Sequence, residues 1–373
     1  MIEIPFFVPD FDTREEEAVV EVLRSGWIAM GPRVEAFEAA FARVMGCDHA
    51  IALNSCTAAL HIANILARLG PGDEVIVPSL TFAATANAVH FTGAQPVFAD
   101  VVGRGDWTLC PASVEARITS RTKAIIPMHY AGYPCDMEAF LSLARRHNLV
   151  LIEDACHGLG GTIGGTAMGN VGTMGCFSFY SNKIMTCGEG GMLTTNDSAL
   201  ASRAKALRSH GQTKTAVDRM RGAMGYDITE VGYNYRLDDL RAAIGLVQLE
   251  RLEHSIVRRT HLVARYRAGL AGVPQVNIPQ HGGRGVPAHY ILPAHVQGVD
   301  RDGLRQGLAD RGIQTSMHYP PVHRFAHYVD PALDLPHTEW VADHALSLPL
   351  YPSMTDLQVD QICDALRDSA EAL

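Results

Sequence analysis

Two residues of opposite charge, Lys183 and Asp154, could carry out carbonyl chemistry together. Lys183 lies in the run Phe177 to Gly191, and Asp154 stands upstream, directly after the mostly apolar run Leu149 to Glu153. A lysine amine becomes a nucleophile toward carbonyl groups when its site lowers its pKa. Pyridoxal phosphate needs an anion opposite its ring nitrogen to accept electrons. The pair therefore predicts a Schiff-base lysine with an acidic partner.

Each member of the pair also has a structural interpretation. Asp154 ends a predicted strand, where ligands of open α/β sheets bind, but an aspartate there can equally cap the next turn. Lys183 precedes three glycines at positions 188, 190 and 191, whose freedom would hold this loop tightly against a cofactor. An exposed lysine beside turn glycines is the alternative, and the two residues alone leave both interpretations open.

The segment Asn54 to Leu60 predicts a seat for a phosphate group. It joins a predicted strand to a helix through small and hydroxylic residues. The first N–H groups of a helix have no partner within the helix, and the helix dipole favours an anion there. The hydroxyl of Ser178, five residues before Lys183, could reach the same phosphate. Serine and threonine are also ordinary helix caps.

Two histidine-containing segments predict a pocket rather than a nucleotide or metal site. The run Ala155 to Gly164 fails as a dinucleotide-binding turn, because the pattern starting at Gly158 needs glycine where Ile163 stands. His157 within it is either a pocket residue near a ring or a structural histidine. The run His318 to His327 contains two prolines and no acidic third ligand, so we expect a loop lining a polar pocket and no metal.

Short apolar runs that alternate with helical patterns must position these residues. The alternation between residues 50 and 200 predicts a mostly parallel sheet covered by helices on both faces. A capping box at Thr13 to Glu16 predicts the first helix, and a second follows Pro32. A long helical pattern follows Asp238. The tail after residue 250 predicts a smaller α/β unit with a strand at His289 to Leu292 and helices near Asp302 to Asp310 and Thr355 to Leu366. The strands predicted before it are Ala50 to Leu53, Glu74 to Val77, Pro96 to Ala99, Ala124 to Pro127, Leu149 to Ile152 and Met192 to Thr195.

Composition excludes several classes of protein. The 373 residues carry a formal charge of −9, which argues against binding along a nucleic-acid backbone. No apolar run approaches the roughly 20 residues of a membrane span, and no basic and then apolar stretch opens the chain, so we expect a cytoplasmic protein. The eight cysteines form no C-x-x-C pair, which is typical of reduced thiols and not of a structural zinc site.

Seven segments in this order resemble the DegT/StrS family of pyridoxal-phosphate-dependent sugar aminotransferases. The resemblance covers nearly the whole chain. It implies the type I fold, which is similar to that of aspartate aminotransferase, with a large cofactor-binding domain over residues 1–250 and a smaller C-terminal α/β domain over residues 251–373. The matching segments are Gly26 to Pro32, Ser55 to Leu60, Pro78 to Asn87, Glu153 to His157, Phe177 to Phe179 with Lys183 and Gly188 to Gly191, Gly232 to Leu237, and His318 to Pro320.

The resemblance also implies a role for each cofactor residue. Lys183 would attach to pyridoxal phosphate and move the proton, and Asp154 would bind the pyridine nitrogen. Phe82 would stack on one face of the ring, with His157 nearby. The family is expected to work as a homodimer with shared active sites. The phosphate would be held by Cys56, Thr57, Ala58 and Ser178, and by Asn234 of the neighbouring subunit.

The implied reaction moves an amino group from an amino acid, expected to be L-glutamate, to a nucleotide-activated deoxysugar. A 4-keto group is the first expectation and a 3-keto group the second. A cyclitol ketone as acceptor stays open, as does a non-catalytic regulatory protein with this fold. Some relatives replace the lysine by histidine and dehydrate sugars, whereas this chain keeps Lys183, which favours transamination. Substrate contacts are expected from Trp27, Ile28, Met30, Tyr319 and His323.

Overall fold

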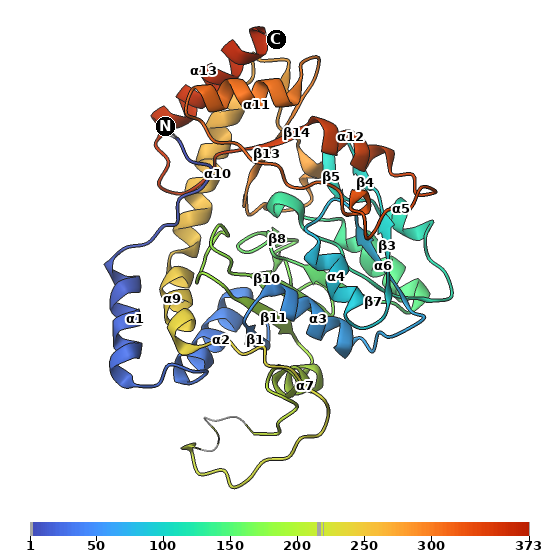
Figure 1. Ribbon diagram of the computed structural model, residues 1–373, viewed down its shortest axis with the longest axis vertical. Helices are drawn as coiled ribbons and strands as arrows, with labels where there is room; N and C mark the ends of the chain where they lie inside the picture. The colour runs from blue at the N-terminus through green and yellow to red at the C-terminus, as the bar shows by residue number, and fades with distance from the viewer. Residues whose placement is uncertain (1–2, 215–217, 219, 373) are drawn as a thin grey trace.

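The computed structural model describes residues 3–214, 218 and 220–372, and its centre is a seven-stranded sheet (Figure 1). The strand order is β1-β11-β10-β7-β6-β2-β3. Only β11 runs antiparallel to its neighbours, so the sheet is mostly parallel, as predicted. The strands are β1 (His49–Leu53), β2 (Glu74–Pro78), β3 (Gln95–Ala99), β6 (Thr122–Ile125), β7 (Val150–Asp154), β10 (Met174–Ser178) and β11 (Gly191–Thr195).

All six strands predicted for this sheet are present, and one was missed. β10 escaped prediction because Gly175 and Cys176 interrupt the run of β-branched and aromatic residues that usually marks a strand. It lies centrally, pairing with β7 on one side and β11 on the other. The missed strand therefore places Ser178 beside the end of β7, which carries Asp154.

Helices cover both faces of the sheet because the strands alternate their side chains between two cores. In β1, Ile51 and Leu53 pack with α3 and α7, whereas Ala50 and Ala52 pack toward α2. One face carries α3 (Cys56–Leu66), α4 (Ala84–His90) and α7 (Ser198–Arg208). The other carries α2 (Pro32–Met45), α5 (Pro111–Glu115) and α6 (Met137–His147). Two hairpins, β4 (Val101–Gly103) with β5 (Asp106–Leu109) and β8 (Thr162–Ile163) with β9 (Thr166–Ala167), lie outside the sheet.

The capping box of the N-terminal helix lies one residue before the predicted one. α1 (Thr13–Ser25) is capped by Asp12, whose carboxylate accepts the Arg14 N–H at 2.8 Å while Glu15 accepts the Asp12 N–H. The prediction took Thr13 as the cap. Asp12 takes that place because an aspartate is at least as good a cap as threonine, and because the register puts Glu15 at the third helical position.

The C-terminal unit has a core of its own. The long helical pattern after Asp238 forms two helices, α9 (Asp239–Glu250) and α10 (Leu252–Gly269), that break at Arg251. α10, α11 (Arg301–Asp310) and α13 (Asp356–Glu371) pack with a three-stranded sheet of β12 (Val276–Asn277), β13 (Leu292–Val296) and β14 (Ala345–Leu348). Ile4, near the N-terminus, belongs to this second core, whereas α12 (Pro336–His344) packs on β4 of the large unit.

The predicted strand at His289 to Leu292 is wrong in its bounds. β13 begins only at Leu292, because His289 has a positive φ of 50° and the N–H of Tyr290 donates to Ala131 in the large unit. Residues 289–291 therefore connect the two units instead of pairing within a sheet. No described helix combines the length and the apolar composition that a membrane span requires.

Candidate active site

A cavity of about 420 Å³ opens at the carboxyl ends of β7 and β10, beside the N-terminus of α3. Parallel strands end at the same edge of a sheet, and that edge is where open α/β folds bind ligands. The cavity brings together eight of the residues predicted for cofactor or substrate, namely Cys56, Thr57, Phe82, Asp154, Ser178, Lys183, Tyr319 and, through its contact with Tyr319, His157.

Asp154 lies at the end of β7 and is 2% exposed. Its Oδ2 accepts the Thr85 hydroxyl at 2.8 Å, and its Oδ1 accepts the N–H of Cys156 at 3.2 Å. A second hydroxyl, that of Thr81, lies 2.8 Å from Thr85 Oγ1. Two neutral donors do not neutralise a buried carboxylate, so the site favours a cationic N–H in the cavity. A protonated pyridine nitrogen is such a group.

Lys183 points its amine at an aromatic ring. Its Nζ lies 4.3 Å from the centroid of the Tyr290 ring. Burial lowers the pKa of Lys183, but Tyr290, followed by the neighbouring thiols and Asp154, raises it by more, so the net shift is upward. The expectation of a site that lowers this pKa is wrong for the polypeptide by itself, because the groups around the amine favour its ammonium form.

The N-terminus of α3 offers the phosphate seat that the sequence predicted, with one change. Ser55 caps the helix, and its hydroxyl accepts the Ala58 N–H at 3.1 Å. The N–H of Ala58, which was predicted to hold the phosphate, therefore already has a partner. Cys56 and Thr57 line the cavity in the first helical turn, where N–H groups lack partners within the helix. The Ser178 side chain lines the cavity from β10, as predicted.

The glycines after Lys183 serve the packing of this seat. A Cβ on Gly191 would lie 2.4 Å from the carbonyl of Ser55 and 2.6 Å from the N of Cys56. Gly188 has a φ of +84°, which favours glycine. The close approach predicted from these glycines is therefore between β11 and the start of α3, which together form one wall of the cavity.

His157 is buried behind the cavity and is held as a neutral ring. The N–H of Ala131 donates to its Nδ1 at 3.3 Å, so the proton lies on Nε2, which donates to the Tyr319 hydroxyl at 2.9 Å. Burial, with Lys183 nearby, lowers the pKa of His157 well below its usual value. Phe82 stands at the opening with 59% of its surface exposed, and its ring centroid lies 5.8 Å from that of Tyr319.

Six predicted residues, besides His157, lie outside the cavity lining of their own chain, and one of them is Ala58, which is buried in α3. Trp27 folds over its own turn, donating its indole N–H to the carbonyl of Met30 at 3.3 Å, and Ile28 is exposed. His323 is buried between the Ser79 hydroxyl, 2.6 Å from its Nδ1, and the carboxylate of Glu339. Asn234 is exposed, and its carbonyl accepts from Asn54. The roles given to Trp27, Ile28, Met30, His323 and Asn234 stay predictions.

Several cavity residues were missed by sequence reasoning. Tyr290 reaches Lys183 across 107 positions of sequence, so no local pattern could have indicated the contact. Thr85 lies inside the segment Pro78 to Asn87, and two hydroxyls four apart on a buried turn were the available signal. The others are Ala84, Cys156, Tyr180, Asn182 and Glu189.

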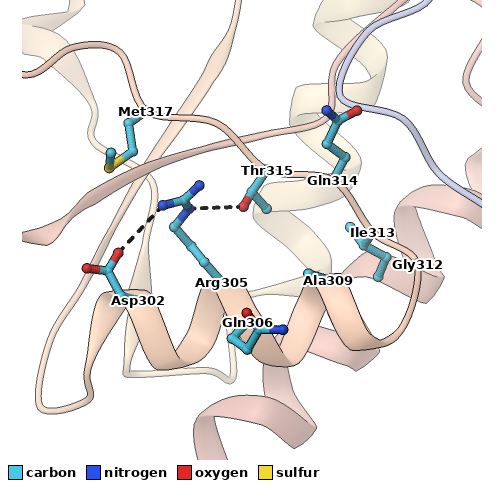
Figure 2. A pocket seen from close by; sticks show the side chains of 9 residues that line it. All are labelled: Asp302, Arg305, Gln306, Ala309, Gly312, Ile313, Gln314, Thr315 and Met317. Carbon is cyan, nitrogen blue, oxygen red and sulfur yellow. Dashed lines mark hydrogen bonds and ion pairs between the residues drawn. The ribbon is translucent and has the colours of Figure 1, made fainter. Parts of the chain in front are cut away.

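A second hollow of about 500 Å³ lies on the surface of the C-terminal unit (Figure 2). It lies along α11, and Arg305 crosses it. Arg305 is already paired, through its Nε with Thr315 Oγ1 at 3.3 Å and through its Nη1 with Asp302 at 3.5 Å. Among the described residues, no group of three or more histidines, cysteines or acids is placed to hold a metal ion in either hollow.

Comparison with known proteins agrees with this geometry. Residues 9–367 match the model of the DegT/DnrJ/EryC1/StrS aminotransferase family. The chain belongs to this family. It is 40% identical to the spore coat polysaccharide biosynthesis protein SpsC of Bacillus subtilis, over 98% of this chain and 96% of that one. This aminotransferase is also similar to solved structures.

The aminotransferase TlmJ from Streptoalloteichus hindustanus is 34% identical with a TM-score of 0.92, over 100% of this chain and 99% of that one. DesV of S. venezuelae, solved in complex with a ketimine intermediate, is 38% identical with a TM-score of 0.90, over 97% of this chain and 95% of that one. The chain is accordingly a pyridoxal-phosphate-dependent sugar aminotransferase with the type I fold. Asp154, Lys183 and the first turn of α3 fit the ring nitrogen, the aldehyde and the phosphate of that cofactor.

Proposed function

We propose that this enzyme transfers the amino group of L-glutamate to the 4-keto group of a nucleotide-activated deoxysugar. The observation that carries the proposal is the meeting of Lys183 and Asp154 in one cavity, with an aromatic opening formed by Phe82 and Tyr319. Supporting it, one similar solved structure, PseC of Helicobacter pylori, is described as an aminotransferase in the biosynthesis of pseudoaminic acid, and SpsC acts in polysaccharide biosynthesis.

The roles of the side chains follow from their charges. When bound, pyridoxal phosphate supplies an electron sink for the carbanion that forms at Cα of the amino donor. Asp154 holds a proton on the ring nitrogen, because a buried carboxylate favours a cation beside it. Lys183 Nζ would move a proton from Cα of the donor to C4′ of the cofactor and, in the second half of the reaction, from C4′ to the sugar carbon that receives the amine. The first turn of α3 holds the phosphate through N–H groups.

We propose further that the enzyme is a homodimer in which each subunit completes the other's site. Phe82 and Tyr180 line the cavity and yet are 59% and 47% exposed, so the cavity of one chain is open on that side. Asn234 faces outward from the same region. Residues 220–231 extend away from the sheet at the bottom of Figure 1. They carry a concentration of exposed apolar side chains that a partner subunit would cover, namely Met220, Met224, Ile228 and Val231.

Product analysis tests the acceptor. The purified enzyme is given L-glutamate with a nucleotide 4-keto-6-deoxy sugar, the 3-keto isomer or a keto-inositol, and the aminated product is identified by mass spectrometry and NMR. We expect amination of the 4-keto sugar at a rate at least tenfold above the other two. Faster amination of the 3-keto isomer or of the inositol would replace the proposed acceptor with that compound.

The donor and the dimer need separate measurements. L-Glutamate should bleach the visible absorbance of the purified protein, and a colourless protein that ignores added pyridoxal phosphate would contradict the whole proposal.

Sedimentation should give twice the mass of the 40.4 kDa chain. An Asn234→Ala chain mixed with a Lys183→Ala chain should regain activity, because one of the two sites in the mixed dimer then keeps both residues.

A further inference from the structure

The contact between Lys183 and Tyr290 has the geometry of a cation–π interaction. Nζ lies 4.3 Å from the ring centroid, within the roughly 6 Å over which a ring quadrupole attracts an ammonium group. Both residues line the same cavity, where Tyr290 is buried and Lys183 is half-buried, and partial removal from water strengthens such an attraction. The ring is therefore placed to act on the charge of the lysine.

Tyr290 is fixed from four directions, so its ring cannot follow the lysine. Its N–H donates to the carbonyl of Ala131 at 3.0 Å, and its carbonyl accepts from the buried Arg259 at 2.9 Å. Its hydroxyl donates to Oδ1 of Asn182, the residue before Lys183, at 3.0 Å. Its ring lies 4.2 Å from that of His157. Because the ring is fixed, its attraction for the ammonium group favours one position of the Lys183 amine.

We propose that Tyr290 is a positioning residue for Lys183, whose ring holds the amine as an ammonium ion at the cavity and so sets the pH at which it can attach to the cofactor. The inference rests on the attachment of the cofactor to Lys183 that the proposed function requires. The other titratable groups that face or surround the amine are Asp154, Cys156, Cys56, His157, His318, Tyr319, Tyr180 and Glu189.

These groups divide into those that favour and those that oppose the ammonium form. Asp154 favours the ammonium form through its charge. The thiols of Cys56 and Cys156 have raised pKa values because they are buried, so they stay neutral near pH 7 and add little charge. His157 and His318 have lowered pKa values, again because of burial, and do not oppose Lys183 with a positive charge at that pH. The ring of Tyr290, 4.3 Å from Nζ, is therefore a neutral partner of the ammonium in addition to the charge of Asp154.

Attachment consumes the neutral amine. The ammonium first gives its proton to solvent, and Nζ then forms a double bond to the aldehyde carbon of pyridoxal phosphate while one molecule of water leaves. Below the pKa of Lys183 the rate of attachment rises about tenfold per pH unit, since the neutral fraction does so. A ring that stabilises the ammonium moves this dependence toward higher pH.

The experiment measures the rate at which pyridoxal phosphate attaches to the full-length apoenzyme between pH 7 and 12, because the pKa of Lys183 is raised from its usual 10.5, and follows it by the absorbance of the adduct. Borohydride trapping and peptide mapping first establish that the label is on Lys183. We expect Tyr290→Leu to shift the midpoint down by about one pH unit, the size of a desolvated cation–π contact. Tyr290→Phe is the matched control: it keeps the ring and removes only the hydroxyl, whose charge at high pH also favours the ammonium, so it should shift the midpoint by less than half as much as Tyr290→Leu.

Fluorinated phenylalanines at position 290 serve if the leucine variant does not fold. Fluorine weakens the ring quadrupole with little change in shape, so the midpoint should fall stepwise from phenylalanine to its monofluoro and trifluoro forms. An unchanged midpoint across this series, or an equal shift in Tyr290→Phe and Tyr290→Leu, overturns the inference. Label on another lysine in the wild-type enzyme would instead overturn the role of Lys183 in the proposed function.

Discussion

The cavity at Lys183 and the hollow on α11 have similar volumes, about 420 and 500 Å³, and very different chemistry. In the hollow, Arg305 is half-buried and is paired with Asp302 and Thr315 (Figure 2). In the cavity, the buried Asp154 accepts from a hydroxyl and an amide N–H and forms no salt bridge with a described residue. Size therefore does not distinguish a site, whereas a buried acid held by neutral donors does.

The largest expected difference between the two regions comes from Lys183→Ala. Loss of the amine removes both the cofactor bond and the group that moves the proton, so amine transfer should fall by roughly 10³-fold or more. Product formation from glutamate and the keto sugar measures this, with circular dichroism to verify folding. Amine transfer at the wild-type rate would show that the lysine is structural.

The next largest effect is expected from Asp154→Asn. Asparagine keeps the size and an acceptor for the Thr85 hydroxyl but loses the charge that holds a proton on the ring nitrogen. We expect kcat to fall by roughly 10²-fold, about 2.7 kcal/mol at the transition state, with little loss of stability. The experiment compares kcat and the urea midpoint of the two proteins, and an unchanged kcat would remove Asp154 from the mechanism.

A smaller effect is expected one contact further out, at Thr85→Val. This substitution leaves Oδ2 of Asp154 without its 2.8 Å hydroxyl donor, and an unmet buried acceptor costs about 1–3 kcal/mol. Cofactor affinity or kcat should fall about tenfold, measured by equilibrium titration and steady-state kinetics. Thr81→Val is the matched control, since Thr81 touches only the hydroxyl of Thr85, and equal effects of both would refute a direct role of Thr85.

Acid should affect the cavity through His318. Burial lowers the pKa of His318 to about 3, whereas the unfolded chain titrates near 6.5. Below pH 6.5 the unfolded state binds the proton and the folded state does not, so stability falls as pH decreases toward 3. Between pH 6.5 and 5.5 His318 should cost about 1 kcal/mol. Urea unfolding at both values should show a smaller decrease for His318→Gln than for the wild type.

The smallest effect is expected in the hollow, from Arg305→Ala. Its partners are exposed or half-exposed, and pairs of this kind contribute little. Both kcat/KM and the free energy of unfolding should stay within about twofold and 0.5 kcal/mol of the wild type. A tenfold change in kcat/KM would instead assign a function to the hollow and reverse the comparison.

The sequence predicted what local patterns encode. Asp154 follows an apolar run and Lys183 precedes turn glycines, and the structure brings both residues into one cavity. The contacts of Tyr290 depend on the packing of two units, so no spacing indicated them. The Ala58 N–H was predicted to hold the phosphate, but it donates to the Ser55 hydroxyl, which caps the helix. A phosphate and a capping side chain compete for the same N–H group, and residue types alone do not decide between them.

One residue ties the chemistry of the large unit to the placement of the small one. Ala131, with a φ of 56°, donates its N–H to His157 and accepts the N–H of Tyr290 through its carbonyl. An engineer who exchanges the C-terminal unit for that of a relative must therefore preserve the register of residues 288–290, since a slip of one position would remove the ring from under Lys183. In a chimaeric enzyme, the seam between the donor proteins would itself be part of the active site.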